Sequence, residues 1–186
     1  TPFLISTTFD FAEQGYVAEE FFLSGTATAF SNLNELMPNG RWEAEPAEMA
    51  EYTTRVLVYR PIEASAFSGT VVVEWLNVTQ GFDVPVGWGS GHVEALRRGH
   101  AWVNVTAQRV GIEGLEDATL PFFLNAVDPE RYATLNHPGD SFSYDIFTQV
   151  TAAIRAEDNI IGGFGAEVVI ATGESLSASR RLPFVN

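Results

Sequence analysis

Three short apolar runs, each typical of a buried β-strand, most constrain what this chain can fold into. They cover residues 70–75 (TVVVEW), 100–108 (HAWVNVTAQ) and 167–172 (EVVIAT). Near-continuous apolar runs of this length are typical of strands that are covered on both faces of a sheet. Helical patterns over residues 90–98 and 143–156, rather than tight turns, separate the runs. This alternation predicts an α/β fold with a mostly parallel sheet flanked by helices.

Two further strands, over residues 19–30 and 53–59, are predicted ahead of these units and are expected to be antiparallel. Between them lie four glutamates within residues 43–51, where we expect a solvated loop or a short helix. A last helix is predicted from about Leu176. The long segment 109–142 is rich in Pro, Gly and Asp and follows a predicted strand end, where open α/β sheets build their binding sites.

The composition argues against several classes of function. The net charge is −14 and every basic residue is Arg, so we expect no binding to the phosphate backbone of a nucleic acid. The absence of cysteine excludes a disulfide, a thiol nucleophile and a Cys-ligated metal, and no His or carboxylate pair has metal-ligand spacing. We therefore predict no metal site and no cofactor. No apolar run approaches the ~20 residues that span a bilayer, and the composition leaves the cellular compartment open.

The strongest chemical signal is the segment VVIATGESLSA, residues 168–178, in which a strand runs through a turn of small residues straight into a helix. This is the context of a nucleophile elbow, where a strained turn holds a serine hydroxyl clear of the sheet. Ser175 is the candidate nucleophile, and Gly173 and Ser177 are the small residues beside it. The pattern G-x-S-x-G is met except that Ser177 replaces the last glycine. The alternative is a serine that caps a helix after a strand.

Two backbone N–H groups are candidates for stabilising an oxyanion. In acyl-transfer enzymes of this architecture, one donor comes from the residue after the nucleophile and one from an earlier strand-to-helix loop. These rules select Leu176 and Val78, the latter in the loop that follows residues 70–75. Asn77 is expected to orient that loop or to donate from its side chain to a substrate. The alternative is a simple polar turn that leaves a buried strand.

Other residues are weaker candidates for the walls of a pocket. His137 and Trp88 are predicted to contact substrate, and Phe122 and Phe123 could add apolar surface, although loop stabilisation and ordinary packing are the alternatives for all four. The glycine-rich segment 87–91 can be considered as a phosphate-binding loop. Its glycines do not match the spacing G-x-G-x-x-G, and the chain has no lysine to contact a phosphate. We expect this segment to be the entry turn of a helix.

Taken together, these motifs resemble the α/β-hydrolase superfamily, and more closely a bacterial family described as alpha/beta hydrolase domain. The resemblance spans nearly the whole chain, and its most specific part is the Gly-Glu-Ser-x-Ser elbow. It implies the nucleophile role for Ser175, which the strand–turn–helix context supports independently. The matching segments are residues 15–17, 24–27, 71–78, 107–111, 137–140, 144–147 and 173–178.

In such hydrolases the catalytic acid and histidine follow the nucleophile on later strands, whereas this sequence ends at Asn186, soon after Ser175. We therefore expect residues 1–186 to form the N-terminal half, with about five strands, of a single domain. A second chain or a continuation would supply the rest, including the acid and the histidine. The leading hypothesis is a serine hydrolase that acts on a carboxylic ester. The alternative is a catalytically inactive, hydrolase-like subunit for binding or assembly.

Overall fold

The computed structural model describes residues 3–5, 7–35, 37–39, 41–116, 120–156 and 159–185, with side chains up to residue 181. The order of strands and main helices is the predicted one, and short helices interrupt the segment 109–142. The strands are β1 (Tyr16–Asn32), β2 (Ala44–Pro61), β3 (Thr70–Trp75), β4 (Ala101–Val105) and β5 (Val168–Gly173). The α-helices are α1 (Val86–Arg98), α2 (Arg109–Glu113), α3 (Leu124–Val127), α4 (Ser143–Ala153) and α5 (Leu176–Val185). Three 3-10 turns are η1 (Ala12–Gln14), η2 (Ala64–Ala66) and η3 (Asp140–Phe142).

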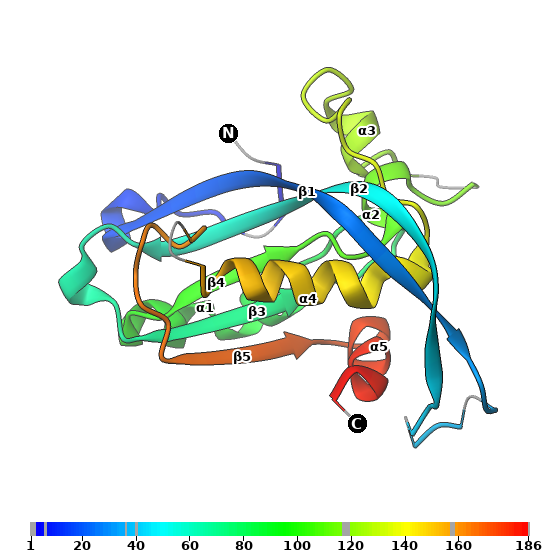
Figure 1. Ribbon diagram of the computed structural model, residues 1–186. Coiled ribbons are helices and arrows are strands. Elements are labelled where there is room, and N and C mark those ends of the chain that lie inside the picture. Colours follow the sequence, from blue (N-terminus) through cyan, green and yellow to red (C-terminus); the bar gives the residue numbers. More distant parts are fainter. Residues whose placement is uncertain are drawn as a thin grey trace.

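The five strands form one mixed sheet in the order β1-β2-β4-β3-β5. β3 pairs in parallel with β4 and β5, whereas β2 pairs antiparallel with both β1 and β4. Strand β2 therefore runs against the other four, which confirms the predicted antiparallel start and the parallel units that follow. Figure 1 shows α5 at the carboxyl end of β5.

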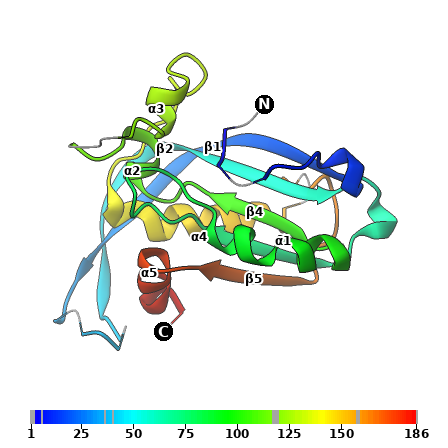
Figure 2. The ribbon, with the colours of Figure 1, turned by 180° about the vertical axis from the view of Figure 1, so that it is seen from behind.

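Helices cover both faces of this sheet, as the sequence predicts. Figure 1 shows α4 across one face, and Figure 2, from behind, shows α1 across the other. Strand β3 divides its side chains between the two, because successive residues of a strand point to opposite faces. Its residues Val71, Val73 and Trp75 belong to the core under α4, and Val72 belongs to the core under α1. Helical spacing within residues 143–156 predicts one apolar face. Its residues are all fully buried, and the last of them lies just past the end of α4: Ile146, Phe147, Val150 and Ile154.

Strand β5 differs from the prediction that it is covered on both faces. Val168 and Ile170 remain 49% and 47% exposed, whereas β3 and β4 are almost entirely buried. The exposure of β5 follows from its position in the sheet rather than from its amino-acid composition. β5 is the last strand in the sheet order and pairs only with β3, so one edge and part of one face lack cover within the described residues.

Two local predictions were wrong. The acidic segment 43–51 is not a loop or a helix but lies mostly in the first half of β2, where pairing with β1 overrides its weak strand propensity.

The glycine-rich segment 87–91 does not precede a helix but lies inside α1, which begins at Val86. The buried carboxylate of Glu74 makes this possible, because it accepts hydrogen bonds from the N–H groups of Gly87 (2.7 Å) and Trp88 (2.8 Å). These N–H groups stand in the first turn of the helix, where they lack helical partners.

Candidate functional site

The turn between β5 and α5 holds a serine in a strained backbone conformation. Strand β5 ends at Gly173 and α5 begins at Leu176, with Ser175 between them. Ser175 has φ 57°, and among the described residues it is the only non-glycine residue with positive φ. Such a conformation costs about 1–2 kcal/mol for a residue with a Cβ, and strain of this kind gathers at functional sites. The serine is also exposed at the turn.

Small residues on each side of Ser175 let the strand and the helix pass closely. A Cβ added to Gly173 would lie 3.1 Å from the carbonyl carbon and oxygen of Ser177. Ser177 itself is fully buried. Its Oγ donates to the carbonyl oxygen of Glu174 at 2.7 Å and accepts from the N–H of Glu174 at 3.1 Å. Ser177, which stands where the motif has glycine, is thus hydrogen-bonded to the turn itself.

The loop after β3 touches the same turn. The side-chain amide of Asn77 donates from Nδ2 to the carbonyl oxygen of Glu174 at 2.9 Å, over 97 positions of sequence. This contact brings together the two segments that carry the predicted oxyanion donors, Val78 beside Asn77 and Leu176 beyond Ser175. Within the described residues, the N–H of Val78 is bonded to no backbone acceptor, and the N–H of Leu176 is bonded to none outside α5. Leu176 stands in the first turn of α5, where N–H groups lack helical partners.

The polar atoms of Asn77 are all engaged by the protein. Its Oδ1 accepts from the N–H of Thr79 at 2.9 Å. Its main chain pairs with Val84 in both directions, at 3.1 and 2.8 Å. These bonds tie Asn77 to both ends of its own loop and to the turn that carries Ser175.

A second polar network fastens α5 to the ends of the central strands, and sequence reasoning missed it. The carboxylate of Asp140 accepts from Gln108 Nε2 at 2.7 Å, Arg180 Nη2 at 3.2 Å and the N–H of Arg109 at 3.2 Å. Gln108 in turn accepts from the indole N–H of Trp75 at 3.2 Å. The only available signal was that Gln108 ends a predicted strand and that Asp140 lies near the end of the irregular segment 109–142. This network holds the carboxyl edge of the sheet against the helix that begins at the turn.

None of the three histidines is hydrogen-bonded to Ser175. His137 is buried; its Nε2 donates to the carbonyl oxygen of Ala107 at 3.0 Å, and its Nδ1 accepts from the N–H of Gly139 at 3.3 Å. Burial lowers the pKa of His137, and its two hydrogen bonds join residues 137–139 to the segment that follows β4. His100 is bonded to Ser68 at the amino end of β4, away from the turn.

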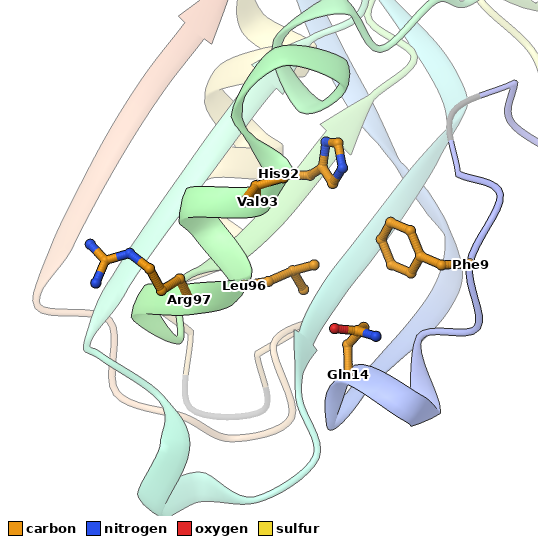
Figure 3. A pocket seen from close by; sticks show the side chains of 6 residues that line it. All are labelled: Phe9, Gln14, His92, Val93, Leu96 and Arg97. Atoms are coloured by element: carbon orange, nitrogen blue, oxygen red, sulfur yellow. The ribbon is translucent and has the colours of Figure 1, made fainter.

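His92 and Trp88 lie on α1, which covers the face of the sheet opposite to α4. Trp88 has no exposed surface and packs with Tyr59 and Trp102, so the structure does not bring it to an accessible pocket wall. Beside it, Figure 3 shows a shallow hollow between α1 and the N-terminal segment. No predicted site residue lines this hollow, whose walls are Phe9, Gln14, His92, Val93, Leu96 and Arg97. Phe122 is 39% exposed and meets Phe82 edge-on, at 5.4 Å between ring centroids.

A buried ion pair anchors the far end of the loop that carries Val78. Asp83 Oδ2 accepts from Arg55 Nη2 at 2.8 Å, and the hydroxyl of Thr106 also donates to it. Both charged side chains are almost fully buried. Burial raises the pKa of Asp83, and the neighbouring Arg55 opposes that rise. Arg55 comes from β2 and Asp83 from the loop after β3, so no local pattern could have paired them.

The described residues offer no evident ion site. Among them, no three His, Asp or Glu side chains gather in an arrangement that could hold a metal ion. No helix in this part of the chain is both long and apolar enough to cross a bilayer.

Comparison with known proteins gives a family match over the whole sequence. A family model described as "Alpha/beta hydrolase domain" matches residues 1–186. No curated protein matches the chain at a significant level. The family match confirms the resemblance seen in the motifs and, with the mixed five-stranded sheet, the predicted fold class.

Proposed function

The chain belongs to the alpha/beta hydrolase domain family, which supports a hydrolase-type activity, and from that premise we propose that it is a serine hydrolase of carboxylic esters. The observation that carries the proposal is the backbone of Ser175, with φ 57° between the end of β5 and the start of α5. A helix cap does not require this conformation, since capping residues commonly adopt extended dihedral angles. A nucleophile elbow does require a sharp, strained turn that exposes the hydroxyl.

The proposed reaction has two steps. The Oγ of Ser175 attacks the ester carbonyl carbon while a base takes its proton, and the N–H groups of Leu176 and Val78 stabilise the oxyanion. Collapse of this intermediate breaks the bond to the alcohol, which leaves with the proton from the base. Water then attacks the acyl-enzyme by the same route, releasing the carboxylic acid and restoring Ser175.

The base is proposed to come from polypeptide outside residues 1–186, either a continuation or a second chain. Two observations support this. His137 is buried with both ring nitrogens bonded, and His100 lies at the amino end of its strand. The half-exposed edge strand β5 offers a place where further strands of the same domain could pair.

The second candidate is a hydrolase-like subunit without turnover, which serves binding or assembly. It is favoured by one observation, that no histidine or carboxylate within the described residues is hydrogen-bonded to the side chain of Ser175. Without a base, a serine hydroxyl is a weak nucleophile.

The test is intact mass spectrometry of the native protein, purified with any polypeptide that continues or accompanies these residues, before and after a fluorophosphonate probe. We expect one adduct that maps to Ser175, is lost in Ser175→Ala and is kept in the control Ser65→Ala, whose serine lies exposed in η2. Absence of an adduct in the native protein would overturn the hydrolase proposal and favour the binding subunit. An adduct that persists in Ser175→Ala would show that another residue is the nucleophile.

A further inference from the structure

The carbonyl oxygen of Glu174 is the most heavily bonded acceptor of the turn. It receives the side-chain Nδ2 of Asn77 at 2.9 Å, the Oγ of Ser177 at 2.7 Å and the N–H of Ser177 at 3.2 Å. A carbonyl oxygen has only two lone pairs, so three donors saturate it. The N–H of the same residue is held as well, by Ser177 Oγ at 3.1 Å.

This carbonyl belongs to the peptide plane that joins Glu174 to Ser175. Peptide planes are rigid, so fixing the carbonyl fixes the plane from which the φ angle of Ser175 is measured. The strained φ of 57° is not an intrinsic preference of serine and persists only where the surroundings over-determine it. The three donors on Glu174 hold the peptide plane on one side of this torsion, and the N–H of Ser179, which donates to the carbonyl oxygen of Ser175 at 3.1 Å, holds the other side.

The two donor residues are themselves buried. Ser177 is 0% exposed and Asn77 is 5% exposed. Asn77 is also bonded to Thr79 and Val84, so it cannot shift without moving the adjacent Val78. One side chain thus connects the position of one proposed oxyanion donor to the turn that carries the nucleophile.

We infer that Asn77 and Ser177 are a pair of positioning residues for the proposed hydrolysis, acting together on the carbonyl of Glu174. The inference rests on the proposed function of Ser175. It gives a role to Ser177, a residue that the motif pattern alone marks only as a mismatch to glycine. The hydroxyl of Ser177 makes two hydrogen bonds to Glu174 that a glycine at this position would lack.

This role makes a prediction opposite to that of the motif. Ser177→Gly restores the full pattern G-x-S-x-G but removes both hydroxyl bonds to Glu174. We expect it to lower kcat, because small displacements of a reacting group cost up to about 100-fold in rate. Ser177→Ala and Asn77→Asp should act in the same direction, since each removes a donor to the same carbonyl.

The experiment compares these three variants of the native protein in the hydrolysis of 4-nitrophenyl acetate, with active sites titrated by the fluorophosphonate. The matched controls are Ser90→Ala, whose hydroxyl bonds Val86 O at 2.8 Å in α1, and Asn159→Asp, whose Nδ2 bonds Phe164 O at 3.0 Å. We expect kcat per titrated site to fall by about 10-fold or more in the three variants, with KM changed by less than about twofold. The controls should keep the parent kcat.

Titration separates positioning from stability, because a variant that merely unfolds loses sites but keeps kcat per site. An unchanged kcat per site in both Ser177→Gly and Asn77→Asp would overturn the inference while Ser175 still takes the label. If instead the native protein takes no label, the proposed function fails, and the inference fails with it.

Discussion

The buried pair of Arg55 and Asp83 provides the sharpest test of what holds the loop after β3 in place. Arg55→Met keeps much of the volume of the side chain but removes the positive charge. It leaves the carboxylate of Asp83 buried, with the hydroxyl of Thr106 as its remaining donor among the contacts described. Oδ1 of Asp83 already lacks a partner among the described residues, so we expect no other donor to replace Arg55.

The expected cost follows from the burial of both groups. Side chains of Arg55 and Asp83 are 1% and 4% exposed, at 2.8 Å from Nη2 to Oδ2. Removing one partner of such a pair costs about 3–5 kcal/mol, because the other charge stays buried without compensation. For a chain of this size each kcal/mol lowers Tm by about 2–4 °C, so we expect a fall of about 10 °C. Neutralising both groups in Arg55→Met/Asp83→Asn should restore a large part of the loss.

The assay is urea unfolding of the parent, both single variants and the double variant, analysed as a cycle. A control is Arg97→Met, which removes an exposed salt bridge to Glu94 and should leave the midpoint unchanged. The reasoning is refuted if Arg55→Met lowers the unfolding free energy by less than about 1 kcal/mol, below the range for breaking a buried pair. It is also refuted if the double variant is as unstable as the sum of the two single ones, since contacting residues should couple.

Two further predictions concern pH and backbone. Burial lowers the pKa of His137 in the folded state, so the unfolded chain takes up the proton first, and stability should be lost as the pH falls below about 6.5. His137→Gln should flatten this part of the profile in urea titrations from pH 5 to 8, and parallel profiles would contradict the assignment. Gly99 and Gly15 have φ 72° and 71°, but a Cβ would lie 2.0 Å from Ala66 O at Gly99 and meet nothing within 4 Å at Gly15. Gly99→Ala should therefore destabilise at least twice as much as Gly15→Ala, and equal midpoints would refute the clash.

Elements with a strong local pattern could be predicted from the sequence. The bounds of β3 are those of its apolar run, because a strand buried on both faces is apolar over most of its length. Its one buried charged residue, Glu74, is bonded to the start of α1. The inner face of α4 follows from helical spacing in the same way. The acidic half of β2 could not be predicted, since its strand conformation depends on pairing with β1 over a separation that no local pattern encodes.

The candidate site shows the same division. The turn around Ser175 could be located because strand, small residues and helix follow one another directly in the sequence. The donors on Glu174 could be located only in part. Ser177 is a near neighbour, but the motif pattern marks it only as a mismatch to glycine, and nothing in that pattern indicates the bonds of its hydroxyl to Glu174.

The sequence by itself determined the order of strands and helices, the strand–turn–helix around Ser175 and the acidic, cysteine-free character of the chain. These are properties of neighbouring residues, whose periodicity and size act over a few positions. Only the tertiary structure decided the sheet order, the exposure of β5 and the partners of Asn77 and Arg55. Those contacts join residues 97 and 28 positions apart, and such pairs form because the packed sheet brings separate loops and strands to one edge.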